Sequence, residues 1–386
     1  MKTKIVHIAL CGPVTDEWNY QDNILPKYHV KLGYEVSMIT SQWVFGTSGK
    51  LQKDTRTEYG NSDGVKMIRL PLKGKDDFSH KFKSYRGLYT TLEKEKPDIL
   101  FIHNITFVDI KIIVKYLKQR PGIRVFADSH NDFSNSATNW LSKNILHKII
   151  WKHYIKKIEP YVTKFYGVLP ARVDFLIDMY NLPKNKCELL LMGADDELVI
   201  KANSSINIKN IREKFNIATD DFLIMTGGKI DSWKTQTLLL MEAVEKIANT
   251  KVKLIVFGSV EDVLKEKMLT FCDGDKIQYI GWVQANQSYN YFAASNLVVF
   301  PGRHSIFWEQ VTGQGIPMIV KHWNGTTHVD LNGNVKFLYE DSVDEIYKIL
   351  TAVIEDESKY INMKKIASAQ GMKAFSYYEI ARRSIS

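Results

Sequence analysis

Short apolar runs alternate with segments of helical periodicity along most of the chain. The runs PDILFIHN, IRVFADSHND and DFLIMTGG are continuously apolar rather than alternating, as in parallel strands that are buried on both faces. Segments of about 10–15 residues with helical spacing separate such runs. Strands separated by helices in this way predict βαβ units and a doubly wound parallel sheet. The expected fold class is therefore α/β.

The alternation is interrupted once, which predicts two domains. The segment Leu189–Ile208 ends a strand, turns through Gly193 and becomes rich in Asn and Ser before the pattern resumes. We expect a first domain over residues 1–197, a second over 198–368, and a helical tail over 369–386. A length of 386 residues agrees with this division, because one hydrophobic core seldom serves so long a chain.

Composition narrows the class of protein without naming a function. The chain is 45% hydrophobic and 25% charged, as in folded proteins. Cys11, Cys187 and Cys272 lie far apart without metal-ligand spacing, which predicts reduced thiols in the cytoplasm. The N-terminal apolar segment is too short and interrupted for a signal sequence, and no run reaches the roughly 20 residues of a membrane span. A net charge of +9 favours an anionic partner such as a nucleotide, a phospholipid surface or a nucleic acid.

One basic segment bears on that choice of partner. Between Lys143 and Lys157 lie five lysines and no acid, and Lys148, Lys152 and Lys156 share a helix face by their spacing of four. Apolar residues fill most of the remaining surface, so a packed helix with a solvated stripe is one interpretation. Contact with anionic lipid headgroups is the other. No nucleic-acid partner is expected, because the basic residues lack aromatic interleaving of a recognised kind.

The sharpest local signal of a ligand site follows the strand DFLIMT. A tight turn at Gly228 leads to Lys229 and Lys234, which stand five residues apart just before a helix. Free backbone amides at a helix N-terminus together with two cations bind an anion such as a diphosphate. Gly258 and Gly281 end neighbouring strands, so their loops are expected at the same sheet edge. Two solvated lysines at a helix start are the alternative interpretation.

A second signal lies in the segment Phe300–Val320, which carries one acidic residue, Glu309. Ser305 can cap a helix that begins after it, with Glu309 in the first turns. A strand follows the break at Gly315. Strand, loop, helix and strand form half of a parallel α/β unit, in which ligands bind at the carboxyl ends of the strands. Glu309 is either a carboxylate that interacts favourably with the helix macrodipole at the helix N-terminus or a ligand-binding residue.

Taken together, these segments resemble one protein family. GGKIDSWK resembles the Gly-Arg/Lys, four residues, Lys element of retaining, nucleotide-sugar-dependent glycosyltransferases with the GT-B fold, the large family that includes sucrose synthase-like and bacterial polysaccharide enzymes (glycosyltransferase family 4-like). Three further segments resemble its other elements, and the resemblance covers essentially the full length: MGADDELV, GWVQANQSYNYFAASNLVVFPG and WEQVTGQGIPMIV. It implies two Rossmann-like domains that face a central cleft. The first would bind the acceptor, the second the nucleotide sugar, and the C-terminal helix would return to the first.

The resemblance implies roles for the donor-side residues. Lys229 and Lys234 would clamp the donor diphosphate, and Glu309 would accept hydrogen bonds from the ribose hydroxyls, because a carboxylate can accept two at once. The remaining members of the predicted donor site are Gly228, Gly258 and Gly315.

One departure from the family pattern concerns the donor sugar. The usual motif has another glutamate eight residues before Glu309, but this chain has Pro301 there. We therefore expect His304 and Ser305 to supply the replacement contacts, with Arg303 as a further candidate that is otherwise solvated.

In the first domain, ADSHNDF resembles a strand-end motif whose histidine faces the donor sugar, which makes His130 a predicted catalytic residue. His103 follows a similar strand and is a second candidate, although a buried structural histidine is the simpler interpretation of it. The loop DEWNYQDN resembles an acceptor-side loop. Trp18 and Tyr20 could stack on a sugar ring there, with Asn19 between them, and a solvated polar loop is the alternative.

These expectations predict transfer of a sugar, with retention, from a nucleoside diphosphate sugar to a glycan or lipid-linked saccharide in surface polysaccharide synthesis. UDP is the expected nucleotide of the donor. No metal or other cofactor is expected, because the two lysines would replace a divalent ion. A cytoplasmic enzyme, peripheral at the inner membrane face, fits this role. The alternatives are a nucleotide-sugar epimerase of the same architecture and a non-catalytic subunit that binds sugar nucleotides or glycans.

Overall fold

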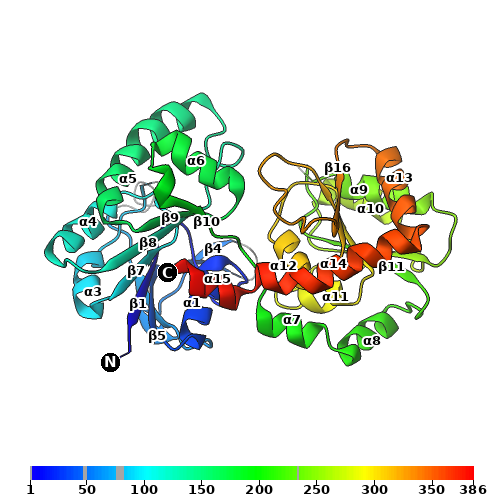
Figure 1. Cartoon of the computed structure of the whole chain (residues 1–386), viewed down its shortest axis with the longest axis horizontal. Coiled ribbons are helices and arrows are strands. Elements are labelled where there is room, and N and C mark those ends of the chain that lie inside the picture. The colour runs from blue at the N-terminus through cyan, green and yellow to red at the C-terminus, as the bar shows by residue number, and fades with distance from the viewer. Residues whose placement is uncertain (1, 47–49, 75–81, 233) are drawn as a thin grey trace. The chain divides into compact units, whose positions relative to one another are not determined.

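The chain folds into two compact units in a computed structural model that describes residues 2–46, 50–74, 82–232 and 234–386. The first unit comprises Met1–Leu191 and Tyr378–Ser386, and the second comprises Met192–Tyr377 (Figure 1). The first unit is therefore discontinuous in sequence, because the last residues of the chain belong to it.

The first unit is built on an eight-stranded sheet with the order β10-β9-β8-β7-β1-β2-β6-β5. Neighbouring strands run parallel except for β5, which pairs antiparallel with β6. The strand order reverses between β1 and β7, as in doubly wound sheets. The strands are β1 (Lys4–Ala9), β2 (Glu35–Ser41), β5 (Glu58–Gly60), β6 (Lys66–Leu70), β7 (Ile99–Ile102), β8 (Arg124–Ser129), β9 (Lys164–Gly167) and β10 (Cys187–Leu189). A separate antiparallel pair is formed by β3 (Trp43–Phe45) and β4 (Leu51–Lys53).

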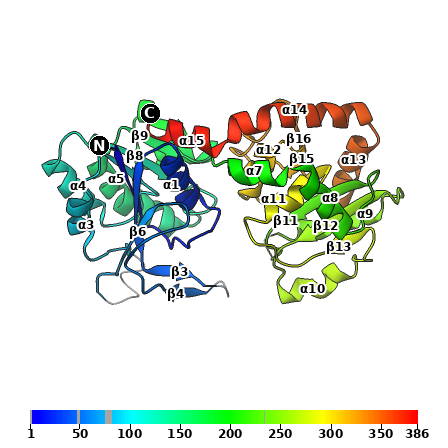
Figure 2. The same ribbon diagram turned by 90° about the horizontal axis from the view of Figure 1, so that it is seen from below.

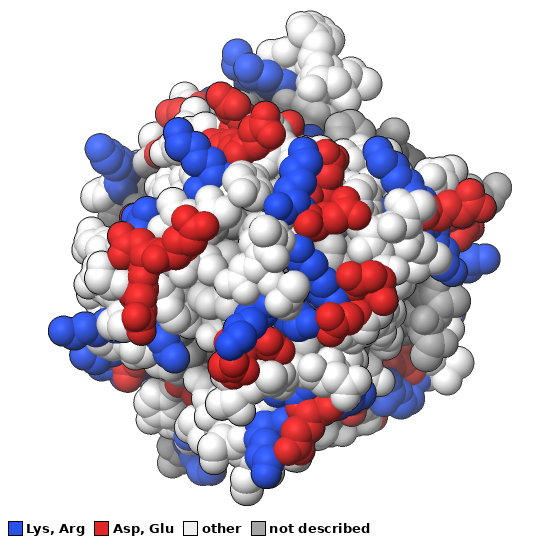
Figure 3. Space-filling view, turned by 90° about the vertical axis from the view of Figure 1, so that its right-hand side faces the viewer, with Lys and Arg blue, Asp and Glu red and all other residues white. Residues whose placement is uncertain are grey.

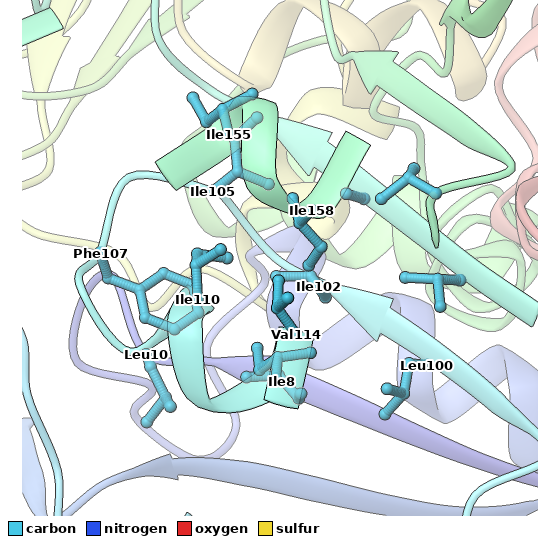
Figure 4. Packing of buried hydrophobic residues seen from close by; sticks show 14 of the residues in the cluster. Ile8, Leu10, Leu100, Ile102, Ile105, Phe107, Ile110, Val114, Ile155 and Ile158 are labelled. Carbon is cyan, nitrogen blue, oxygen red and sulfur yellow. The ribbon is translucent and has the colours of Figure 1, made fainter. Parts of the chain in front are cut away.

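Helices cover both faces of this sheet (Figure 2). One face packs against α3 (Leu88–Glu95), α4 (Ile110–Gln119), η1 (Ser142–Trp151), α5 (Lys152–Ile158) and α6 (Pro170–Tyr180). Figure 4 shows the centre of this core, where Ile8 and Ile102 from the strands meet Val114 and Ile158 from the helices. The other face carries α1 (Gln21–Lys31) and α15 (Tyr377–Ser384). Two short turns of 3₁₀ helix complete the unit, η2 (Glu159–Tyr161) and η3 (Lys184–Lys186).

The second unit is built on a parallel six-stranded sheet with the order β13-β12-β11-β14-β15-β16. The strands are β11 (Phe222–Gly227), β12 (Val252–Phe257), β13 (Ile277–Tyr279), β14 (Leu297–Phe300), β15 (Met318–Lys321) and β16 (Val335–Leu338). One face packs against α9 (Gln236–Glu245), α10 (Asp262–Leu269) and α13 (Val343–Ile354). The remaining helices are α7 (Asp196–Ala202), α8 (Ser205–Lys214), α11 (Ser288–Ala293), α12 (Phe307–Gly313) and α14 (Glu357–Phe375).

Two helices of the second unit touch so closely that glycine is required between them. A Cβ added to Gly371 in α14 would lie 2.1 Å from the carbonyl oxygen of Thr312 in α12. Gly315, just after α12, has φ +76°, and a Cβ there would lie 2.9 Å from Cα of Ser368. Because backbone atoms cannot move aside as side chains do, these glycines set the separation of α12 and α14.

Three expectations from the sequence need correction in detail. Ser305 does not cap α12, which begins at Phe307 after Ile306 and has no side-chain cap. The segment Leu189–Ile208, which interrupts the helix and strand pattern in the sequence, contains the starts of two helices, because Asp195 and Ser204 cap α7 and α8 within it. The C-terminal tail is not one helix, since α14 ends at Phe375 and α15 starts at Tyr377. None of the helices in the described ranges combines the length and apolarity needed to cross a membrane.

We expect Gly371→Ala to lower the free energy of unfolding of the protein. Alanine favours a helix over glycine by up to about 1 kcal/mol, but overpacking against rigid backbone costs about 1–3 kcal/mol. The net loss should therefore be roughly 1–2 kcal/mol, measured by chemical denaturation. Gly60→Ala is the matched control, because no atom lies within 4 Å of its added Cβ. Equal stability of the two variants would contradict the close helix contact.

Candidate functional site

A pocket opens in the second unit where β11 and β14 end side by side. The strand order reverses between these neighbours, and open α/β sheets bind ligands at such a position. The described lining comes from the end of β11 and the loop after it, the first turn of α9, the end of β12, and the end of β14 with its loop: Thr226–Ile230, Lys234, Thr237, Val256, Phe257, Phe300–Arg303 and Ser305. The pocket thus brings together four predicted donor residues, Gly228, Lys229, Lys234 and Ser305, with Arg303 beside them.

Backbone crowding shapes the floor of this pocket. The N–H of Gly228 donates to the carbonyl of Phe257 over 3.0 Å, and both Gly228 and Gly258 have positive φ, +129° and +130°. A Cβ on Gly258 would lie 1.8 Å from the carbonyl oxygen of Gly228. Gly258 is therefore required for the two loops to approach each other, although it is not among the described residues of the pocket lining.

The two lysines of the pocket have different surroundings. Lys229 is exposed and pairs with Asp231 at 3.1 Å and Glu261 at 3.6 Å, and its bond to Asp231 raises its pKa. Lys234 is half-buried. Its burial lowers its pKa, and the nearby Arg303 and Lys229 lower it further. The positive charges therefore converge, and an anion placed between them would relieve their repulsion.

The net charge of the chain does not by itself mark this site. On the face shown in Figure 3, basic and acidic side chains are interspersed rather than grouped by sign. The attraction for an anion at the pocket is consequently local, arising from its own cations and from the N-terminus of α9.

Glu309 lies in the first turn of α12 and is completely buried. Its Oε1 is 2.7 Å from Nε2 of His304 and 2.8 Å from Nε2 of His328. Its Oε2 is buried and has no hydrogen-bond partner among the described residues. Four predicted donor residues, Gly258, His304, Glu309 and Gly315, lie outside the described lining of the pocket.

The electrostatics of Glu309 follow from its two histidines. Burial alone would raise its pKa, but the charges and N–H groups of His304 and His328 outweigh burial and hold the pKa well below its usual range. The three side chains also form a set that could hold a metal ion. Ligands around a tetrahedral zinc at about 2.0–2.1 Å would stand roughly 3.3 Å apart, whereas distances of 2.7 and 2.8 Å are those of N–H···O hydrogen bonds. The geometry is that of a hydrogen-bonded cluster.

In the first unit, His130 follows β8 and its side chain is 31% exposed. Its Nε2 lies 3.5 Å from Oδ1 of the buried Asp128 and has no hydrogen-bond partner among the described residues. The second candidate, His103, is buried and lies 3.0 Å from Oδ2 of Asp128 through its Nδ1. The side chain of His130 is thus partly exposed, whereas His103 is enclosed.

The predicted acceptor residues lie on the loop that follows β1, at the same carboxyl edge of the sheet. Tyr20 is 54% exposed. Trp18 contacts it at 5.6 Å between ring centroids and stacks on Phe45 at 5.4 Å. Nδ2 of Asn19 is buried without a partner in the described ranges. An exposed aromatic ring with an unused amide beside it can bind a sugar face.

Sequence reasoning missed three participants of these clusters. His328 stands in a loop between β15 and β16 with no motif around it, and only the fold brings it to Glu309. His7 and His29, which lie in a row with His103 in the core, were hidden within an apolar strand and a helix. Asp128, in contrast, carried a usable signal, because it is an acid in a buried strand two residues before His130.

The comparisons with known proteins agree with this architecture. Residues 207–370 match the family described as glycosyl transferases group 1. No curated protein sequence matches the chain.

Solved structures resemble the whole chain. Sucrose-phosphate synthase from Thermosynechococcus elongatus aligns with 99% of this chain and 97% of its own, with a TM-score of 0.71 at 13% identity. HepE from Anabaena in complex with UDP-glucose aligns with 99% and 98%, with a TM-score of 0.66 at 13% identity. A putative UDP-N-acetylglucosamine 2-epimerase from Listeria monocytogenes aligns with 99% and 95%, with a TM-score of 0.64 at 12% identity.

The two doubly wound sheets and these full-length alignments confirm the GT-B fold expected from the sequence. The chain is a glycosyltransferase whose second unit contains a glycosyl transferases group 1 domain.

We expect His328→Phe to destabilise the protein by about 1–3 kcal/mol at pH 7, because it leaves the buried Glu309 with one partner instead of two. His322→Phe is the matched control, since His322 stacks on Tyr339 at 4.9 Å without touching Glu309. Chemical denaturation of both variants measures the difference.

The pH dependence of this loss has a defined sign. The pKa of Glu309 is lowered in the folded chain, so its stabilising contribution is present above the unfolded value of about 4.3 and is lost as the pH falls toward the folded value. The difference between wild type and His328→Phe should therefore shrink only below about pH 4. A constant difference down to that range and below would contradict the charge pairing.

Proposed function

We propose that the protein transfers a sugar from a UDP-sugar to a glycan or lipid-linked saccharide acceptor of surface polysaccharide synthesis, with retention at the anomeric carbon. The observation that carries this proposal is the convergence of Lys229, Lys234 and the N-terminus of α9 on a pocket at the switch point of the second sheet. A diphosphate is the anion that this pocket fits. Support for uridine comes from the similar HepE structure, which holds UDP-glucose.

The two cations would act on the leaving group. As the bond from the sugar to the diphosphate breaks, negative charge grows on the phosphate oxygens. Fixed positive charge at that place is usually the largest catalytic contribution. Lys229 would exchange its contacts with Asp231 and Glu261 for the diphosphate, whereas Lys234 is already held beside the pocket by its half-buried position.

Glu309 would bind the ribose through Oε2, because Oε1 is already occupied by His304 and His328. The donor sugar would meet Ser305 at the pocket wall, and His304 would act on it from the side that faces Glu309. The glycines Gly228, Gly258 and Gly315 would serve by allowing close backbone approach. In this arrangement His304 and Ser305 take the place of the missing glutamate.

On the first unit, His130 would contact the donor sugar, and the loop with Trp18, Asn19 and Tyr20 would bind the acceptor. The exposed ring of Tyr20, the partly exposed side chain of His130, and Nδ2 of Asn19, which has no hydrogen-bond partner among the described residues, support this assignment.

An epimerase of the same architecture is the competing function, since a putative 2-epimerase also matches the fold. The two activities differ without an acceptor. An epimerase would convert a UDP-sugar alone into a new UDP-sugar, whereas a transferase needs the acceptor for turnover. Mass spectrometry with a panel of nucleotide sugars, with and without saccharide acceptors, separates them and identifies the donor.

We propose that the enzyme works in the cytoplasm, peripheral at the inner face of the membrane. Residues 133–149 expose a basic apolar surface composed of Phe133, Trp140, Leu141, Lys143, Lys148 and Ile149. Trp140 and Leu141 are 71% and 63% exposed. Large apolar side chains beside lysines bind an interface that carries anionic headgroups.

Lys234→Ala should lower kcat/KM for sugar transfer by about 100-fold, the effect of removing one preorganised charge from the transition state. UDP binding, measured by calorimetry, should weaken as well. Lys246→Ala is the control, because this exposed lysine pairs with Glu242 on α9 away from the pocket. Transfer at near wild-type rate in Lys234→Ala would refute the assignment of the donor site.

The double variant Trp140→Ser, Leu141→Ser should bind vesicles of phosphatidylcholine and phosphatidylglycerol at least about tenfold more weakly than wild type. Burying one large apolar side chain contributes about 1.5–3 kcal/mol, which exceeds the energy of a tenfold change. Ile206→Ser in α8 is the control, because Ile206 is equally exposed, at 72%. Wild-type protein that ignores anionic vesicles in co-sedimentation would contradict the membrane proposal.

A further inference from the structure

Three buried histidines form a continuous row in the first unit. Nε2 of His103 lies 2.8 Å from Nδ1 of His7, and Nε2 of His7 lies 2.9 Å from Nδ1 of His29. Their exposed fractions are 2%, 0% and 0%. We call His103, His7 and His29 the histidine chain. Polar groups buried to this degree cost free energy unless each is hydrogen-bonded.

Both ends of the histidine chain meet a group that accepts hydrogen bonds. At one end, Nδ1 of His103 lies 3.0 Å from Oδ2 of Asp128. At the other end, Nε2 of His29 lies 3.1 Å from the carbonyl oxygen of Ala381 in α15. A carbonyl oxygen never donates, and neither does an ionised carboxylate. Each end therefore needs a hydrogen on the ring nitrogen.

Counting the hydrogens shows that neutral rings are not enough. The row contains four contacts, Asp128 to His103, His103 to His7, His7 to His29, and His29 to Ala381. Each contact requires one hydrogen. A neutral imidazole carries one N–H, so three neutral rings supply three. A fourth proton is required, or two acceptors face each other in the core.

Ser384 offers the one arrangement that would avoid the extra proton. Its Oγ lies 3.0 Å from Nε2 of His29 and 2.9 Å from the carbonyl oxygen of Ala381. If the hydroxyl donated to His29, all three rings could be neutral, but Nε2 would then present a lone pair to the carbonyl at 3.1 Å. If the hydroxyl donates to Ala381, Nε2 of His29 donates to both oxygens and no such conflict arises.

The surroundings favour a cation at the His103 end. Besides Asp128, the carboxylate of Asp22 in α1 lies 3.4 Å from Nδ1 of His103. Gln21 donates to Oδ2 of Asp128 over 3.1 Å, and the backbone N–H of Asn104 donates to Oδ1 over 2.8 Å. Asp128 is thus held as an ionised acceptor beside the ring that needs a second N–H.

The pKa directions of the three rings agree with a cation at His103. Burial would lower the pKa of His103, but the charge of Asp128 outweighs it and raises the pKa. Burial lowers the pKa of His7 well below its usual range and that of His29 to about 3. The ring of Tyr34 packs edge-on against His29.

We propose that the histidine chain holds one proton more than three neutral rings, and that the resulting cation at His103 fixes the carboxylate of Asp128 beside His130. Oδ1 of Asp128 lies 3.5 Å from Nε2 of His130. His103 is then a positioning residue for His130. The part that concerns His130 rests on the proposed function, whereas the proton count does not.

Nitrogen NMR of the intact protein tests the proton count without reference to activity. At pH 7, we expect both ring nitrogens of His103 to carry hydrogen, and only Nε2 of His7 and of His29. Single His→Gln variants assign the signals. A neutral His103, or hydrogen on Nδ1 of His29, would overturn the proposal in favour of the neutral row.

Ser384→Ala separates the two arrangements independently. In the proton-holding chain the hydroxyl is not a required donor, so His103 should stay doubly protonated and the midpoint of unfolding should change little. In the neutral row its loss would strand Nε2 of His29 and lower the midpoint strongly. Ser386→Ala is the matched control, because its hydroxyl donates to the carbonyl of Arg383 at an exposed position.

We expect the contribution of the histidine chain to the free energy of unfolding to pass through a maximum as the pH is raised. The lowered pKa values of His7 and His29 make stability rise with pH up to about 6.5, and the raised pKa of His103 makes it fall as the pH passes above 6.5 through the folded value. Asp128→Asn should abolish the falling part. A wild-type profile without that part would contradict the buried cation.

Activity tests the positioning role. We expect His103→Gln, checked for folding by circular dichroism, to lower kcat by about tenfold or more with little change in KM, because general acid–base and positioning contributions depend on orientation. Asp128→Asn provides the same test if His103→Gln fails to fold. If NMR confirms the proton but kcat is unchanged, the positioning role is refuted. If wild-type protein transfers no sugar while the proton is present, the proposed function fails and the proton count stands.

Discussion

The direction in which the chain leaves neighbouring strands determines where this protein can bind a ligand. After β11 the chain crosses to the face that carries α9, and after β14 it turns into α12, which lies outside that helical layer. Two loops that diverge from adjacent parallel strands leave a space between them, and the pocket with Lys229 and Lys234 occupies it. The first unit repeats the arrangement at β1 and β7, whose helices α1 and α4 belong to opposite layers. Loop chemistry can therefore vary while the position of the site stays fixed.

The same divergence explains why glycine is needed in some places and charge in others. Gly258 is required because two strand-end loops touch through their backbones, and Gly371 because two helices do. Where the loops separate, side chains line the space between them, and Lys229 and Lys234 make this space cationic. Each unit also has a buried carboxylate near the carboxyl ends of its strands. Glu309 contacts two histidines, and Asp128 contacts His103. Each carboxylate is compensated by imidazole rather than by arginine.

The parts of this picture that depend on local sequence were predictable. Continuous apolar runs give the parallel strands, and the glycine turn with Lys229 and Lys234 gives the pocket, because all the necessary atoms lie within a few residues. Cap residues of α7 and α8 were also present in the sequence, at Asp195 and Ser204, but the Asn- and Ser-rich segment around them was interpreted as the boundary between two domains. The contact of His328 with Glu309 could not be foreseen, because it depends on the return of a loop nineteen residues away. The contacts of His7 and His29 could not be predicted for a related reason. The residues that surround a histidine within an apolar strand or helix do not indicate which side chains it will contact.

The discontinuity of the first unit has a consequence for synthesis of the protein on the ribosome. Its sheet and α1 are translated first, but residues 378–386 follow only after the whole of Met192–Tyr377. Until then the carbonyl of Ala381, which accepts from His29 in the finished fold, does not exist, and the face of the sheet that α15 covers stays open to water. The first unit therefore lacks the acceptor for His29 until the second unit has been synthesised. Synthesis of residues 378–386 completes the first unit, so this unit can close only after the second unit has been made.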